Sequence, residues 1–279
     1  MQRPFQVRYS FYLAGPRRFV DNRARNRGSW QRVQLDLVTF IVVGFGAQLV
    51  DGALGMAFGV ISSTMMIALG VPPKVASAGV HAVEMVTTGV SGVSHALHRN
   101  IDWKLFRRLA VPGVVGGVIG AYVLTNIPAD VAKPFVLAYL MIIGGILLYR
   151  GFFALPKARD PRVVAPLGLV GGFLDAAGGG GWGPVVTGNL LLQGSDPRKT
   201  IGTVNSAEFF LATATSIAFL TQLGLEVLTT ATLGLLIGGV LAAPFGAWLA
   251  KRIPAKVLLA LVGTVLIATS AYGIYRAIA

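Results

Sequence analysis

The sequence of 279 residues contains no cysteine and has few charged residues. The absence of Cys excludes disulfides, thiolate metal sites and iron–sulfur clusters. Charged residues make up 13% of the chain, against roughly 25% in soluble domains, while hydrophobic residues make up 54%. This composition predicts an integral membrane protein, which we expect to be a multi-pass protein of the cell (inner) membrane.

Catalytic and nucleotide-binding motifs are also missing. The chain has no Gly-x-Ser-x-Gly elbow, no Gly-x-x-x-x-Gly-Lys phosphate loop and no His-Glu-x-x-His helix. We therefore expect neither an enzyme nor an ATP-driven pump in this chain, and no cofactor. The net charge of +13 is carried by a tail and by short loops, where membrane topology requires it, so nucleic acid is not an expected partner.

The N-terminal segment 1–34 is rich in Arg, and its apolar stretch is too short for the core of a signal peptide. We expect a basic, partly disordered tail whose charge sets topology or binds lipid.

The rest of the chain is a duplicated unit. A stretch of about forty residues recurs 124 positions later without a gap, so that Asp51 matches Asp175 and Glu84 matches Glu208. The two membrane repeats are predicted at 35–151 and 163–279. Duplication inside an apolar chain is typical of secondary transporters, in which the substrate lies near the midplane between the repeats.

Each half contains five apolar elements, and the first two of each half are shorter than the roughly 20 residues that a full span needs. The predicted elements are 36–50, 53–69, 75–98, 106–125, 131–150, 163–175, 182–193, 199–222, 228–250 and 255–277. The short pairs are interpreted as half-helices that meet at a break, at Asp51–Gly52 and between Asp175 and Gly183. The predicted fold is an all-α membrane protein with roughly 8–10 spans.

An odd number of elements per half inverts the second repeat relative to the first. Inversion places most basic loops on one side, which the positive-inside rule makes cytoplasmic, but it leaves the basic tail outside. A parallel repeat of four spans would bring the tail inside and spread the loop charges over both sides. We expect inverted repeats.

The third element of each half carries polar groups on one helical face. In the first half they are Ser77, His81, Glu84, Thr88, Ser91 and His95. Inserting a carboxylate at mid-membrane costs about 2.5–3.5 kcal/mol, so we expect Glu84 and Glu208 to have a role that offsets this cost. Three roles remain open: a proton relay of Glu84 with His81, a structural hydrogen bond, or a metal site, which is the least expected. The candidate proton-coupling residues are Glu84, His81 and Glu208, with Glu84 favoured because His81 lies one turn away.

A glycine-rich run precedes the second short element of the second half. Its flexible backbone can direct several N–H groups toward an oxyanion at a helix start, whereas the alternative role is tight helix packing. Asp51 and Asp175 are predicted to cap the short helix after each break. The candidate substrate-binding residues are Gly178, Gly179, Gly180, Gly181, Trp182, Asn205, Ser206, His81 and Gly55. For Trp182 the alternative is that it fills the interface between the repeats, which is slightly favoured over a place in the pocket wall.

Three segments together resemble the sulfite exporter TauE/SafE family. They are the runs Gly46 to Gly59, Gly171 to Pro184 and Val204 to Glu208, and the resemblance covers nearly everything after residue 36. It implies a carrier of small sulfur-containing or organic anions, such as sulfite or sulfonates, across the cytoplasmic membrane. The lipid bilayer is a further expected partner, and a proton relay would add protons. A cation or metal carrier using the four carboxylates, and a non-transporting accessory protein, are the alternatives; a homodimeric state is left open.

Overall fold

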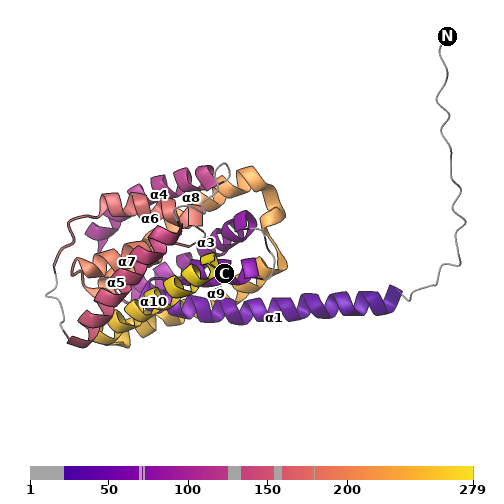
Figure 1. Cartoon of the computed structure of the whole chain (residues 1–279), viewed down its shortest axis with the longest axis horizontal. Helices are drawn as coiled ribbons and strands as arrows, with labels where there is room; N and C mark the ends of the chain where they lie inside the picture. The colour runs from indigo at the N-terminus through magenta and orange to yellow at the C-terminus, as the bar shows by residue number, and fades with distance from the viewer. Residues whose placement is uncertain are drawn as a thin grey trace, which may run out of the picture.

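The computed structural model describes residues 22–68, 71, 73–124, 133–153, 159–178 and 180–278. Within these residues it contains ten α-helices, one short 3-10 helix and no strand (Figure 1). In chain order they are α1 (Asn22–Leu54), α2 (Phe58–Ala68), α3 (Pro73–Leu97), α4 (Trp103–Leu124), α5 (Lys133–Phe153), α6 (Ala165–Gly178), α7 (Trp182–Leu192), α8 (Pro197–Leu223), η2 (Gly224–Val227), α9 (Thr230–Arg252) and α10 (Ala255–Ile278). The all-α prediction is confirmed for this part of the chain.

The start of the chain differs from the predicted elements. The expected tail lies outside the described residues up to residue 21, and the remainder of it belongs to α1. The first break, predicted at Asp51–Gly52, is wrong by a few residues, because α1 continues to Leu54. The Asp51 carbonyl accepts the Gly55 N–H at 2.6 Å, which extends the helical pattern, and Gly52 lies where α1 touches Gly246 of α9. Gly52 therefore serves helix packing, and the break itself lies after Leu54.

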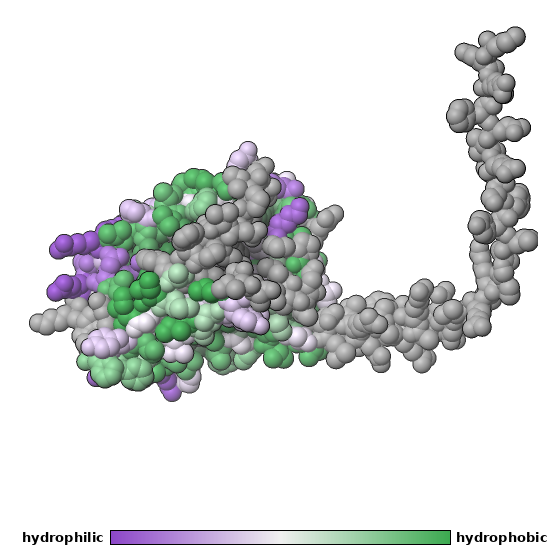
Figure 2. Space-filling view, viewed as in Figure 1, coloured by the Kyte–Doolittle hydropathy of each residue, from purple (hydrophilic) through white to green (hydrophobic). Residues whose placement is uncertain are grey.

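Four of the described helices are long and apolar enough to cross a membrane. The spans are Leu37–Leu54 in α1, Trp103–Val123 in α4, Thr230–Arg252 in α9 and Lys256–Tyr275 in α10. Large apolar side chains on these helices are exposed, among them Val42, Val111, Leu241 and Leu261. Figure 2 shows this apolar surface in green, with hydrophilic residues in patches at its edges. Such a surface is stable against lipid and not against water, so the chain is a multi-pass membrane protein.

The helices pack in pairs, and each pair joins one helix of the first repeat to one helix of the second. The repeat alignment converts the α1–α9 pair into the α6–α4 pair, and it converts the α3–α8 and α5–α10 pairs into themselves. Helix α1 packs along α9 and α4 along α6, while α5 packs along α10 and α3 along α8. Single glycines mark the matching contacts: Gly44 touches Leu235 between α1 and α9, and Gly168 touches Leu109 between α6 and α4.

Helices α3 and α8 run antiparallel through the centre. Gly202, near the start of α8, touches Asn100, which follows the end of α3. Near the other ends, the rings of His81 and Phe219 lie 5.7 Å apart. Both helices are polar for membrane helices, and burial among the others keeps this polarity away from lipid.

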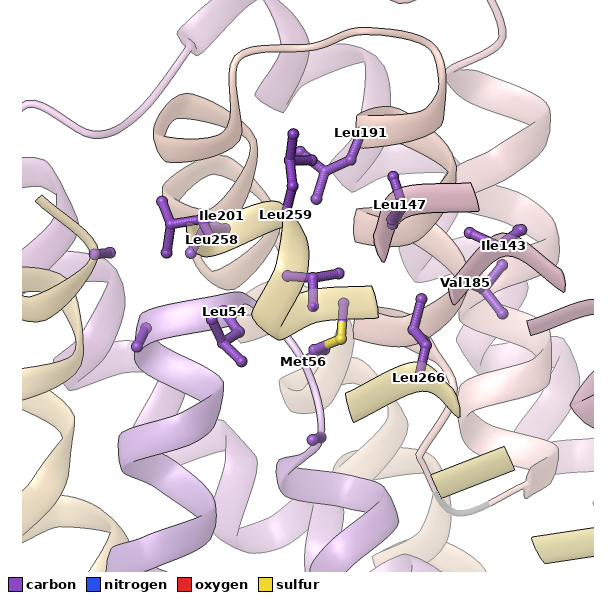
Figure 3. Close-up of a cluster of buried hydrophobic side chains, with 14 residues drawn as sticks. Leu54, Met56, Ile143, Leu147, Val185, Leu191, Ile201, Leu258, Leu259 and Leu266 are labelled. Atoms are coloured by element: carbon purple, nitrogen blue, oxygen red, sulfur yellow. The ribbon is translucent and has the colours of Figure 1, made fainter. Parts of the chain in front are cut away.

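A buried apolar cluster holds α7 and the first break in place. Figure 3 shows Met56 at the break, Val185 and Leu191 on α7, and side chains of α5 and α10 around them. The labelled members are Leu54, Met56, Ile143, Leu147, Val185, Leu191, Ile201, Leu258, Leu259 and Leu266. Because this cluster packs α7 along its length, from Val185 to Leu191, the polar groups at the start of α7 are rigidly positioned.

Candidate functional site

The two breaks in the helix pairs meet at the centre of the bundle. Helices α2 and α7 have 11 residues each, or about 16 Å, which is roughly half the hydrocarbon thickness. At the first break, the Gly55 carbonyl accepts a hydrogen bond from Thr187 of α7 at 2.7 Å. At the second, Gly180 lies directly against Gly59 and Val60 of α2. Each short helix therefore contacts the break of the other repeat.

Gly180 is held there by two constraints, and Gly180→Ala is expected to destabilise the protein. Its φ is +132°, and an added Cβ would lie 2.4 Å from the Gly59 carbonyl carbon. The backbone conformation alone costs an L-residue about 1–3 kcal/mol, and the contact adds to it. The control is Gly46→Ala on α1, where a Cβ meets nothing within 4 Å and alanine favours the helix. Thermal unfolding compares the two, and equal midpoints would contradict this constraint.

Asp175 joins the second break to α3. Its Oδ2 lies 3.0 Å from His81 Nε2, and its Oδ1 accepts the backbone N–H groups of Gly181 at 2.7 Å and Trp182 at 2.9 Å. The other ring nitrogen of His81 lies 2.8 Å from the Ser77 carbonyl. Asp175 and His81 are both buried. The carboxylate thus supplies the helix cap that Gly181 at the N-cap position lacks, and it ties α7 to the opposite repeat.

Asp51 makes the equivalent arrangement at the first break with a different partner. Asn205 of α8 donates from Nδ2 to the Asp51 carbonyl at 3.0 Å and to its Oδ2 at 3.3 Å. The Asp51 carboxylate also accepts the backbone N–H of Phe58, the first residue of α2. In the duplicated sequence Asn205 occupies the position of His81. The two caps are therefore equivalent in position, but only one includes an imidazole, which can bind and release a proton.

Glu84 and Glu208 lie between the two caps. Glu84 on α3 is 1% exposed and Glu208 on α8 is 4% exposed, and Oε2 of each has no hydrogen-bond partner among the described residues. Both face a small cavity with a volume of about 10 Å³ for the centre of a water molecule, which is room for about one water. Its lining is Asp51, Ala57, Gly59, Val60, Glu84, Asp175, Gly180, Gly181, Gly183, Pro184 and Glu208.

The charge around this cavity is dominated by acids. Four carboxyl groups line it and no Lys or Arg does, while His81 reaches it only through Asp175. In a medium of low dielectric constant, four carboxylates this close to one imidazole cannot all be ionised together. The cavity therefore holds protons on its carboxyl groups or attracts a cation.

The backbone N–H groups of the glycine run, which were predicted to bind an external anion, are bonded to a residue of the protein itself. The N–H groups of Gly180, Gly181 and Trp182 all donate to Asp175, the first to its backbone carbonyl at 3.2 Å. Gly178 is the last residue of α6, and Gly179 lies outside the described residues. In this conformation the protein's own carboxylate occupies the position proposed for an oxyanion, so substrate binding by this run stays a prediction.

Other predicted substrate-binding residues surround the cavity without lining it. Trp182 is fully buried, its ring packs against Gly113, and its Nε1 donates to the Val204 carbonyl at 3.2 Å. Ser206 donates to the Gly202 carbonyl at 2.7 Å. Contacts of this kind are those of packing and of polar satisfaction within the bundle.

Sequence reasoning missed the pairing across the repeats. It treated Asp51 and Asp175 first as helix caps and, in the alternative of a cation carrier, as ion-coupling groups, and it related His81 to Glu84 on the same helix. The available signal was the alignment of the repeats, which places His81 opposite Asn205 and Asp51 opposite Asp175. The two aspartates occupy matching positions of the repeats, and so do their polar partners. This match indicates that the same contact is made once in each repeat.

The arrangement also contains a possible cation ligand set. One ligand atom each from His81, Glu84 and Asp175 lies within 4.8 Å of the others. Carboxylate oxygen and imidazole nitrogen are the ligands that first-row divalent metals accept.

Comparison with known proteins assigns the sequence to a family. The model of the family described as sulfite exporter TauE/SafE matches residues 40–273. The probable membrane transporter protein YtnM of Bacillus subtilis (strain 168) is 42% identical over 244 residues, covering 84% of this chain and 81% of the relative. The probable membrane transporter protein YunE of the same strain is 30% identical over 118 residues, or 40% of this chain and 43% of the relative. No solved structure gives a significant match. With helices that span a membrane and a buried polar site between two broken helix pairs, the chain belongs to the sulfite exporter TauE/SafE family and is a membrane transporter.

Proposed function

We propose that this protein is a secondary transporter of the cell inner membrane that moves small sulfur-containing or organic anions, such as sulfite or sulfonates, together with protons. The observation that carries the proposal is the pair of buried carboxyl groups, Glu84 and Glu208, whose Oε2 atoms face the central cavity without a partner among the described residues. The family supplies the class of substrate.

Proton coupling follows from electrostatics. An anion that approaches four carboxylates is repelled, so it enters the cavity only when these groups carry protons. A protonated carboxyl group then has an O–H that donates a hydrogen bond to the anion oxygen. Because the anion binds with the proton and is repelled after the proton leaves, the two cross the membrane together.

Inverted repeats provide the route for alternating access. Equivalent helices α3 and α8 run antiparallel, which supports a two-fold axis in the membrane plane. The central cavity has room for about one water, so a larger anion requires the helices around it to move apart. We propose that α2 and α7, whose caps Asp51 and Asp175 are each bonded to a residue of the opposite repeat, move in alternation and open the cavity to one side at a time.

The test of the substrate class is flux into liposomes that contain the purified protein. We expect sulfite or an alkanesulfonate to enter faster than into protein-free liposomes, and the rate to rise when the outside is acidic. Flux of no anion and no cation would favour an accessory protein.

A second candidate is transport of a divalent cation, which the close approach of His81, Glu84 and Asp175 favours. The same liposomes decide between the two, with Mn²⁺ and Zn²⁺ in place of the anions. Metal flux that is lost in His81→Asn, in the absence of anion flux, would replace the anion proposal.

The inverted arrangement predicts the labelling pattern of two exposed positions. Lys104 at the start of α4 and Gln222 at the end of α8 are both exposed, and the chain has no native Cys to cause background. A Cys in place of Lys104 should react with an impermeant reagent from the cytoplasmic side, and one in place of Gln222 from the opposite side. Parallel repeats predict labelling of both from one side.

A further inference from the structure

A second cavity opens at the end of the bundle, where α3 ends and α8 begins. Its volume is about 500 Å³, within the range of small-molecule sites, and it shares no lining residue with the central cavity. The end of α9 and the start of α10 complete it, with Ile253 and Leu258 as its apolar part. We call this cavity the basic cleft. It is defined by Arg99, Arg198, Lys199 and Lys251 together with the apolar residues Ile253 and Leu258.

Four basic side chains line the cleft against one carboxylate. They are Arg99, Arg198, Lys199 and Lys251. The carboxylate of Asp196 caps α8 by accepting the Lys199 N–H at 2.8 Å, and among the described residues no ion pair involves any of the four cations. The positive charge of the cleft is therefore left without a matching acid.

Lys199 and Arg99 are each fixed in place at this cleft. The Lys199 ammonium donates to the carbonyls of Arg99 at 2.8 Å and Ile101 at 3.3 Å, which holds the α3–α4 connection against α8. Arg99 has a φ of +56°, and the Asn100 N–H donates to the His95 carbonyl at 2.9 Å, which is the helix ending that usually places Gly at this position. The chain thus keeps a cation where the backbone favours glycine.

We propose that the basic cleft binds a phosphate-type oxyanion, supplied by the headgroup of an acidic phospholipid or by a free oxyanion in solution. Unpaired cations at the end of membrane helices attract such groups, and the apolar wall at Ile253 and Leu258 accommodates the glycerol and first acyl carbons of a lipid. The proposal goes beyond transport and does not depend on which anion the central cavity carries.

The test uses the purified full chain in neutral detergent, with the thermal unfolding midpoint as the readout of binding. Dihexanoyl phosphatidylglycerol, dihexanoyl phosphatidylcholine and inorganic phosphate are titrated separately. We expect the midpoint of the wild type to rise with phosphatidylglycerol and not with phosphatidylcholine. A rise with phosphatidylglycerol alone identifies the lipid headgroup, and an equal rise with inorganic phosphate identifies a free oxyanion.

Three variants separate the cleft from general charge. Arg198→Gln combined with Lys251→Gln should weaken the apparent affinity about thirty-fold, from about 1 kcal/mol per basic residue. Arg99→Gly should weaken it about five-fold by the same measure while leaving the midpoint without ligand unchanged or higher, because glycine suits the backbone there. Arg107→Gln, on the exposed side of α4 outside the cleft, is the matched control and should bind as the wild type does.

The proposal is overturned if no anion raises the midpoint of the wild type, or if the double variant and the Arg107→Gln control bind equally well. A loss of binding in Arg99→Gly that accompanies a lower midpoint without ligand also counts against it, because it would make Arg99 structural.

Discussion

Asp175→Ala is expected to destabilise this protein by about 3–5 kcal/mol, the size of effect seen when one partner of a buried ion pair is removed. The change leaves His81 buried without its partner, and it leaves the N–H groups of Gly181 and Trp182 without an acceptor. Because these groups begin α7, the short helix should also lose its fixed position beside the cavity. Thermal or denaturant unfolding of the purified variant in detergent measures the loss.

Three matched variants identify the cause. Asp51→Ala removes the equivalent cap, whose partner Asn205 is neutral, and should cost less. Asp196→Ala removes an exposed cap of α8 and should cost about 1 kcal/mol. His81→Asn gives Asp175 the amide partner that Asp51 has and should also cost less than Asp175→Ala. Equal losses for Asp175→Ala and Asp196→Ala would contradict a special role for the central pair.

Glu84→Gln is expected to abolish the dependence of anion flux on a pH gradient while the protein still folds and binds anion. Gln keeps nearly the same shape and one carbonyl acceptor but carries no exchangeable carboxyl proton. Glu84 lies beside His81 and Asp175, so its proton has a titratable neighbour. The measurement is the flux of a sulfonate into liposomes, first with the outside acidic and then with equal pH on both sides. The ratio of the first flux to the second should fall to about one in the variant if a single carboxyl carries the coupled proton.

Glu208→Gln is the matched control on the equivalent helix. Glu208 faces the same cavity, but the residue one turn before it is Asn205, which cannot carry a proton at physiological pH. In Glu208→Gln the anion flux should still depend on the pH gradient. Loss of coupling in Glu208→Gln alone would reverse the assignment, and retention in both variants would remove the carboxyl relay from the mechanism.

The helices were predictable where apolar runs end at charges or prolines. The last eight, from α3 to α10, begin and end within a few residues of their predicted bounds, because hydrophobicity and local breakers set these ends. The first break was misplaced because Gly52 was taken for a breaker, whereas tertiary contact with Gly246 uses it for close helix packing. Local sequence does not distinguish these two uses of glycine.

The candidate site was predictable in its residues but not in its contacts. Glu84, Glu208, Asp51 and Asp175 could be named because a carboxylate is costly in a membrane and must serve a purpose. Their convergence on one cavity depends on the crossing of α3 and α8 and on the contact between the two breaks, neither of which periodicity determines. The occupation of the Gly181 and Trp182 N–H groups by Asp175 likewise follows only from the fold.

Simultaneous measurement of anion and proton movement tests the central claim most directly. Liposomes containing the wild-type protein and an internal pH indicator are placed in a gradient of methanesulfonate, an anion that stays ionised and does not itself carry protons. The account predicts that the lumen acidifies as the anion enters and that both movements require the protein. Anion entry at an unchanged internal pH, with the membrane potential clamped, would contradict proton-coupled transport by the central carboxyl groups.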